Sequence, residues 1–83
     1  MSIIYDEEWL PSLDGTHTKR IYRDGDPLAI GRVRLWQNGE EGELTREWFT
    51  AERWSTGRYV PLEGEHANFL EAAGRIVFYT ATH

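Results

Sequence analysis

Residues 28–37 read LAIGRVRLWQ, and this stretch decides the fold that we expect. The apolar side chains of Val33 and Leu35 alternate with the arginine and tryptophan side chains of Arg32, Arg34 and Trp36. Alternation with a period of two is the signature of a half-buried β-strand, because successive side chains point to opposite faces of a sheet. The stretch therefore predicts a strand with one apolar face and one face that carries arginine and tryptophan.

A hairpin is expected directly after this strand. Asn38-Gly39 is the strongest short hairpin signal, and the acidic residues 40–43 lengthen the turn. Residues 44–50 read LTREWFT and predict the return strand, with Leu44, Arg46 and Trp48 on one parity. If the register pairs the matching faces, arginine and tryptophan lie side by side on one side of the sheet.

Two further strands are expected on either side of this hairpin. Residues 16–23 are rich in β-forming types and end at the turn pair Asp24-Gly25. Residues 53–60 predict another strand, in which Gly57 forms a bulge or bend and in which Trp54 and Arg58 share a parity. Pro61 ends that strand.

Residues 1–15 predict an acidic N-terminal arm with a short strand at 2–5. Trp9 and Leu10 are expected to dock this arm on the body of the protein. If the acidic residues of the arm cover the arginines of the sheet, binding there requires displacement of the arm.

The C-terminal part predicts a helix over 65–74 and a terminal strand over 75–83. His66, Phe69, Leu70 and Ala73 recur at the i, i+3, i+4 and i+7 spacing of an apolar helix stripe. Gly74 is a natural helix stop, and the tail after it is β-branched and aromatic. A helix that continues through the tail is the alternative.

Together these elements predict one α+β domain of 83 residues. We expect a curved antiparallel β-sheet of 4–5 strands, with one short amphipathic helix near the C-terminus. Its parts are the arm at 1–15, a β-meander at 16–62, the helix at 65–74 and the strand at 75–83. A domain this small has a thin stability margin, so a homodimer is a possible assembly.

Composition argues against several classes of function. The chain has no cysteine, no apolar run near the ~20 residues that span a bilayer and no signal-peptide pattern, so we expect a cytoplasmic protein that binds no membrane. His17, His66 and His83 lack ligand-like spacing, and no phosphate-binding loop or nucleophile motif is present. We therefore expect no catalytic residue, no metal site, no cofactor and no enzymatic activity.

Single-stranded nucleic acid is the expected ligand, because arginine meets phosphates and aromatic rings stack on bases. The net charge is −5, but residues 32–62 balance five arginines against five glutamates. The candidate nucleic-acid-binding residues are Arg32, Arg34, Trp36, Arg46, Trp48, Trp54 and Arg58. The competing interpretation is that these tryptophans belong to the core and that the arginines pair with glutamates across strands.

Residues 28–77 also resemble the PC4-like family of transcriptional coactivators. The resemblance lies in the strand segment LTREWFT at 44–50, the following stretch WSTGRYVPL at 54–62 and the helix EHANFLEAA at 65–73. It implies a sheet that binds single-stranded DNA through Arg46, Trp48, Trp54 and Arg58. It also implies a helix that packs or dimerises through Phe69, Leu70 and Ala73.

A protein-binding module is the second hypothesis: an acidic inhibitor or adaptor, of a kind that a phage could encode, that occupies a basic surface of its partner. The acidic clusters at 6–8 and 40–43 and the surplus of tryptophan fit such a protein. Arginines gathered on one concave face favour nucleic acid, whereas arginines scattered and paired with glutamates favour a protein partner.

Overall fold

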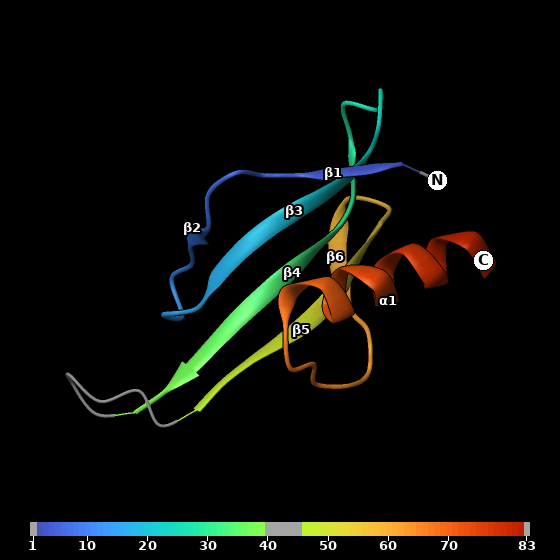
Figure 1. Cartoon of the computed structure of the whole chain (residues 1–83). Coiled ribbons are helices and arrows are strands. Elements are labelled where there is room, and N and C mark those ends of the chain that lie inside the picture. The colour runs from blue at the N-terminus through green and yellow to red at the C-terminus, as the bar shows by residue number, and fades with distance from the viewer. Residues whose placement is uncertain (1, 40–45, 83) are drawn as a thin grey trace.

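The computed structural model describes residues 2–39 and 46–82. Within these residues the chain forms one six-stranded antiparallel sheet and one helix at the C-terminal end (Figure 1). The elements are β1 (Ile3–Tyr5), β2 (Leu10–Pro11), β3 (His17–Arg23), β4 (Ala29–Asn38), β5 (Arg46–Ser55), β6 (Arg58–Pro61) and α1 (Phe69–Thr82). The expected α+β class, with an antiparallel sheet and a C-terminal helix, is confirmed.

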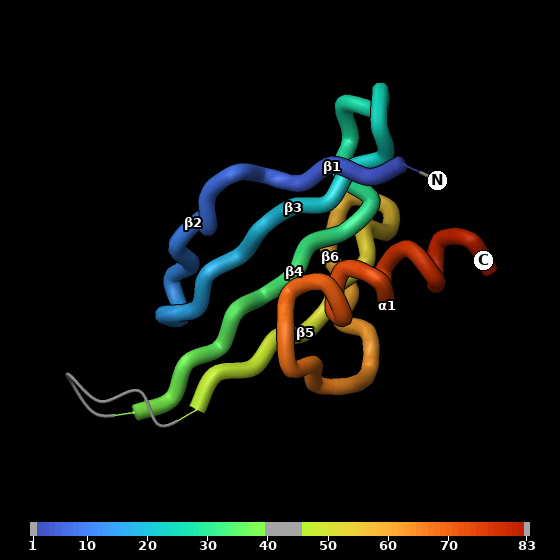
Figure 2. Tube along the Cα trace, viewed as in Figure 1, coloured from blue at the N-terminus to red at the C-terminus, as the bar shows by residue number. Residues whose placement is uncertain are grey.

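The sheet is a meander whose strands lie in the order β1-β3-β4-β5-β6, and β2 also pairs with β3. The trace in Figure 2 shows β4 and β5 running side by side, and their pairing is the longest between strands of the described residues. The sequence placed β3 and β4 correctly to within one residue at each end. The turn expected at 40–43 and the start of the return strand at Leu44 lie outside the described residues.

The hydrophobic core lies between one face of the sheet, which we call the helix face, and α1. Its buried side chains come from β3, β4, β5 and α1: Ile21, Val33, Phe49, Ala51, Ala72, Ala73 and Ile76. Gly31 lets the helix approach closely, because a Cβ atom there would lie 2.8 Å from Cγ2 of Ile76. A core built around alanine and glycine is small, so each large side chain in it matters for stability.

Helix α1 begins later and ends later than the sequence predicted. Asn68 Oδ1 accepts a hydrogen bond from the Glu71 backbone N–H, and Glu71 Oε2 accepts one from the Ala67 N–H. This reciprocal capping arrangement fixes the helix start at Phe69 rather than near residue 65. His66 is instead extended and exchanges backbone hydrogen bonds with Phe49.

The terminal strand predicted over 75–83 is wrong, because α1 continues through Gly74 to Thr82. A glycine inside a helix costs only about 1 kcal/mol relative to alanine. Burial of Ile76 against the sheet contributes about 1.5–3 kcal/mol, which outweighs that cost. Tertiary packing therefore overrides the β-propensity of the tail.

The strand predicted over 53–60 is in fact two strands. Thr56 and Gly57 have φ values of 44° and 87° and form the two-residue turn of a hairpin between β5 and β6. Trp54 therefore lies opposite Tyr59, and Ser55 lies opposite Arg58. Of the bulge or bend expected at Gly57, the structure has the bend, since Gly57 lies in this turn, and the bulge is absent there. A register shift occurs instead in the pairing of β3 with β4, between Ile21 and Tyr22.

The N-terminal arm docks on the helix face, as expected for Trp9. The Trp9 ring packs against Phe49 and Phe69, with centroids 6.0 and 5.7 Å away. Lys19 Nζ lies 5.0 Å from the centroid of the Trp9 ring and donates a hydrogen bond to the Glu7 carbonyl. Leu10, which was expected to dock as well, remains 42% exposed in β2.

Candidate ligand-binding face of the sheet

The second face of the sheet, which we call the open face, is not covered by a helix in the described part of the chain (Figure 1). Its register places Arg32 opposite Glu52, Trp36 opposite Trp48, and Trp54 opposite Tyr59. The open face includes Thr18, Arg20, Tyr22, Arg32, Arg34, Trp36, Arg46, Trp48, Thr50, Glu52, Trp54 and Tyr59, and its edges add Ile4, Leu10, Asn38 and Pro61. The alternation read from the sequence therefore collects arginine and aromatic side chains on one surface.

Six of the seven residues singled out in the sequence share this face: Arg32, Arg34, Trp36, Arg46, Trp48 and Trp54. Arg58 does not, because it pairs with Ser55, the neighbour of Trp54 that points to the other side. The sequence missed Tyr59 and Tyr22. Recognition of Thr56-Gly57 as a hairpin turn would have placed Tyr59 opposite Trp54 and corrected Arg58 at the same time.

At one end of the open face, Trp36 and Trp48 form a nearly parallel pair. Their ring centroids are 5.9 Å apart and the ring planes differ by 4°. Trp36 Nε1 donates a hydrogen bond of 2.8 Å to Thr50 Oγ1, and the Arg46 guanidinium lies 4.3 Å from the Trp48 centroid. These contacts hold both rings in place, and side chains that are already ordered lose less entropy when they contact a ligand.

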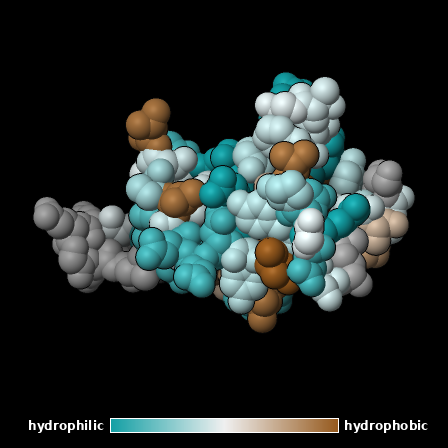
Figure 3. Space-filling model, turned by 90° about the horizontal axis from the view of Figure 1, so that it is seen from above, coloured by the Kyte–Doolittle hydropathy of each residue, from teal (hydrophilic) through white to brown (hydrophobic). Residues whose placement is uncertain are grey.

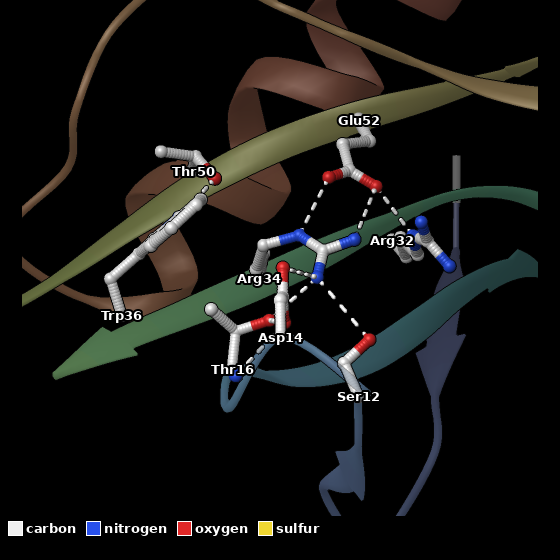
Figure 4. Close-up of polar contacts among 8 residues, drawn as sticks. All are labelled: Ser12, Asp14, Thr16, Arg32, Arg34, Trp36, Thr50 and Glu52. Atoms are coloured by element: carbon white, nitrogen blue, oxygen red, sulfur yellow. Dashed lines mark hydrogen bonds and ion pairs between the residues drawn. The ribbon is translucent and has the colours of Figure 1, made fainter.

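In the middle of the open face, Glu52 binds two arginines (Figure 4). Glu52 Oε2 accepts a hydrogen bond of 2.9 Å from Arg34 Nε, and Glu52 Oε1 accepts one from Arg32 Nε. The Arg34 and Glu52 side chains are only 11% and 9% exposed. A charge this buried is tolerated only when it is paired and hydrogen-bonded, so this Arg–Glu–Arg cluster is structural first.

The cluster also shifts the ionisation of its carboxylate. Burial raises the pKa of Glu52, but the hydrogen bonds and positive charges of Arg34 and Arg32 outweigh it and hold this pKa below its ordinary value. Glu52 is therefore ionised at neutral pH. It cancels much of the positive charge that Arg32 and Arg34 would otherwise offer to a phosphate.

At the far end of the open face, a second aromatic group surrounds Tyr59. The Trp54 and Tyr59 rings meet edge to face with centroids 5.0 Å apart. The Arg32 guanidinium lies 4.0 Å from the Tyr59 centroid. Because strand residues advance about 3.4 Å each, Trp54 and Trp48 lie roughly 20 Å apart along β5. The open face thus carries two aromatic groups with an ionic cluster between them.

The N-terminal arm contributes acids and hydroxyls to this face. Asp6 Oδ2 accepts a hydrogen bond of 2.8 Å from Arg20 Nε, and Asp6 Oδ1 accepts one from the Tyr22 hydroxyl. Around Arg34, Nη1 donates to Thr16 Oγ1 at 2.6 Å and lies 3.4 Å from Asp14 Oδ2 (Figure 4). Acids of the arm therefore engage two arginines of the open face.

These contacts lower the pKa of both acids of the arm. Burial raises the pKa of Asp6, but hydrogen bonds from Arg20 and the Arg20 charge outweigh it and lower this pKa. Hydrogen bonds from the Thr16 side chain and backbone lower the pKa of Asp14.

Within residues 2–39 and 46–82, four other arginines form no ion pair: Arg23, Arg53, Arg58 and Arg75.

The three helix residues expected to pack or dimerise have different environments. Ala73 is buried in the core, and Phe69 packs against Tyr5 and Trp9. Leu70 is 72% exposed.

Seen from above, hydrophobic side chains form separate patches within a largely hydrophilic surface (Figure 3). This side of the molecule therefore shows no broad continuous apolar area of the kind that marks large interfaces.

Two further observations concern residues 2–39 and 46–82 alone. No group of three or more histidine, aspartate or glutamate side chains there is arranged to hold a metal ion. The helix in that part of the chain is too short to cross a bilayer.

Comparison with family models, with curated proteins and with solved structures finds no match for this chain. The resemblance to the PC4-like family stays a prediction. The function must therefore be argued from the geometry of the open face.

Proposed function

We propose that this protein is a non-catalytic binding module that holds single-stranded nucleic acid on its open face. The observation that carries the proposal is the register of β4, β5 and β6, which places Trp36 beside Trp48 and Trp54 beside Tyr59 on a face without a helix. Aromatic side chains on a sheet surface hold successive bases by stacking, at about 1–3 kcal/mol for each base.

The pairing of the arginines predicts an unusual balance of forces for such a ligand. Arg32 and Arg34 already bind Glu52, and Arg46 binds Glu65 at 2.6 Å. Few phosphates can then be neutralised, so stacking supplies most of the affinity. For single strands the slope of log K against log salt is about −0.7 for each phosphate contact, and we expect two or three contacts at most.

The test is a titration of labelled oligo-dT, about 20 nucleotides long, followed by fluorescence anisotropy at two or more salt concentrations. Trp48→Ala is expected to weaken binding by about 1–3 kcal/mol, because a stacking platform is lost. Phe78→Ala is the matched control, since Phe78 is 63% exposed on α1, away from the open face. Absence of wild-type binding at ~50 mM salt, where electrostatic attraction is strong, would rule the proposal out.

A protein partner with a basic surface is the second candidate, and the pairing of arginines with acids favours it. Four arginines have acidic partners, and the chain carries a net charge of −5. A labelled oligolysine peptide serves as the stand-in for a basic partner surface. Salt-sensitive binding of this peptide that is weakened by Glu7→Gln and Glu8→Gln, without any binding of oligo-dT, supports this candidate instead.

A further inference from the structure

An open pocket of about 190 Å³ lies at the Trp54 end of the open face. Tyr22, Trp54 and Tyr59 supply aromatic walls, Pro27 and Leu28 supply an apolar rim, and Arg20 supplies the polar edge. Leu28 is 68% exposed although it is apolar, and it stands on the loop between β3 and β4. An aromatic pocket with one polar edge suits a flat ring that carries hydrogen-bonding atoms on its rim.

The volume limits what this pocket can take. Pockets for drug-sized ligands usually occupy about 300–1,000 Å³, whereas a cavity of about 150 Å³ accommodates a benzene ring. The pocket therefore has room for one planar ring system and not for a whole nucleotide or a longer ligand. The sugar and the phosphates of a bound strand would lie outside it, along the open face.

Arg20 determines which ring fits best. Arg20 Nε donates a hydrogen bond of 2.8 Å to Asp6 Oδ2, which fixes the guanidinium in place. The Cζ atom of Arg20 lies 5.9 Å from the centroid of the Tyr22 ring. The two terminal Nη atoms of Arg20 make no hydrogen bond to any described residue. Because Asp6 neutralises the charge of Arg20, the directional N–H donors, rather than charge, distinguish one ligand from another.

We propose that this pocket binds a single base of the strand and that it prefers guanine. The O6 and N7 atoms of guanine are paired acceptors, and arginine binds them with two parallel hydrogen bonds. Thymine offers O4 as its one acceptor on the corresponding edge, and adenine places a donor beside N7. The inference rests on the proposed function, because it names the base that the open face selects from a single strand.

The experiment compares oligo-dT with the same oligonucleotide carrying one central dG, dA or dC, with anisotropy as the readout. The wild type is expected to bind the dG oligonucleotide on the order of tenfold more tightly than oligo-dT. Arg20→Lys keeps the positive charge but not the planar fork, so the ratio of dG to oligo-dT affinity measured on this variant is expected to fall to about one. Trp48→Ala is expected to weaken all four oligonucleotides by the same factor and to keep the preference.

The possible outcomes separate this inference from the proposed function. If oligo-dT binds and dG gives no gain, or if the gain survives in Arg20→Lys, the guanine pocket is wrong and the nucleic-acid proposal stands. If no oligonucleotide binds, both fail together. If N-acetyltryptophanamide saturates the wild type but not Trp54→Ala and no oligonucleotide binds, the pocket accepts an aromatic protein side chain instead. Circular dichroism establishes that each variant is folded.

Discussion

The helix face and the open face of the sheet are built from the same strands, yet they use their side chains in opposite ways. The helix face joins small and aliphatic residues to Phe49, and its largest fully buried side chains are Ile21, Val33 and Ile76. The open face carries three of the four tryptophans and a nearly buried Arg–Glu–Arg cluster. Three tryptophans and the most buried ion pairs of the described residues therefore lie on the face that α1 does not cover.

This difference bears on function, because a domain of 83 residues has little stability to spare. Large aromatic side chains would stabilise it most if the core enclosed them. Instead Trp54 is 42% exposed, and Trp36 and Trp48 are only half-buried. The difference between the faces supports the proposal that the open face binds a ligand while the helix face maintains the fold. Variants on the two faces should then affect different measurements.

The largest expected effect is on the helix face. Ile76→Ala removes a fully buried side chain from the contact with Gly31 and should lower the free energy of unfolding by about 2–5 kcal/mol. Phe78→Ala, on the exposed side of the same helix, should change it by less than about 0.5 kcal/mol. Urea denaturation measures both values. Equal effects of the two variants would show that α1 is not anchored as described.

A smaller loss of stability is expected from Glu52→Gln at the centre of the open face. This change leaves Arg34 nearly buried without its carboxylate and should cost about 1.5–3 kcal/mol in urea denaturation. Glu47→Gln is the control, because Glu47 is exposed on the same strand. Glu52→Gln also frees Arg32 from its ion pair. Oligo-dT should therefore bind Glu52→Gln more tightly than the wild type and with a steeper salt slope. Unchanged binding would mean that the cluster serves the fold alone.

The pH dependence of stability provides a second readout of Glu52. Its pKa is lower in the folded protein than its ordinary value of 4.5, chiefly because the hydrogen bonds from Arg34 and Arg32 outweigh burial. The stabilisation is therefore fully present above about pH 4.5 and is lost as the pH falls through the folded-state pKa. Urea denaturation from pH 7 to pH 3 should show a smaller acid loss in Glu52→Gln than in Glu47→Gln.

The sequence predicted the sheet well because its signals there are local. The alternation around Val33 gave both faces of β4, and the same parity at Arg46 and Trp48 gave the matching face of β5. The sequence does not state the length of the turn between β4 and β5, so the turn alone does not predict their register. The apolar side chains favour the observed register, because a slip by one residue would move the apolar face of a strand to the solvent side.

The errors arose where long-range packing or a turn outweighed local propensity. The tail after Gly74 has β-forming residues, but Ile76 finds its partner at Gly31, far away in the sequence. Asn68 and Glu71 do have the spacing of a capping box, and that signal was available. At Thr56 a β-branched residue adopts a positive φ, which sequence rules disfavour, so the sequence predicts one strand with a bulge or bend at Gly57 rather than a hairpin turn between two strands.

The smallest expected effect on stability concerns Arg46, at the end of the open face. Its ion pair with Glu65 is more than half exposed on both sides, and exposed pairs contribute about 0.2–1 kcal/mol. A double-mutant cycle with Arg46→Gln and Glu65→Gln, measured by urea denaturation, should therefore give a coupling energy in that range. A coupling well above 1 kcal/mol would show that this edge of the open face is part of the fold.

The same two variants should differ sharply in binding, because only Arg46→Gln removes a group that would contact the proposed ligand. Arg46→Gln loses the guanidinium over the Trp48 ring and should weaken oligo-dT binding severalfold. Glu65→Gln releases Arg46 for a phosphate, so it should strengthen binding and add about 0.7 to the magnitude of the salt slope. If the two variants change oligo-dT affinity in opposite directions while both leave stability nearly unchanged, the binding role of this face is separate from its structural role. Equal and negligible effects would confine any ligand to the Trp54 end of the sheet.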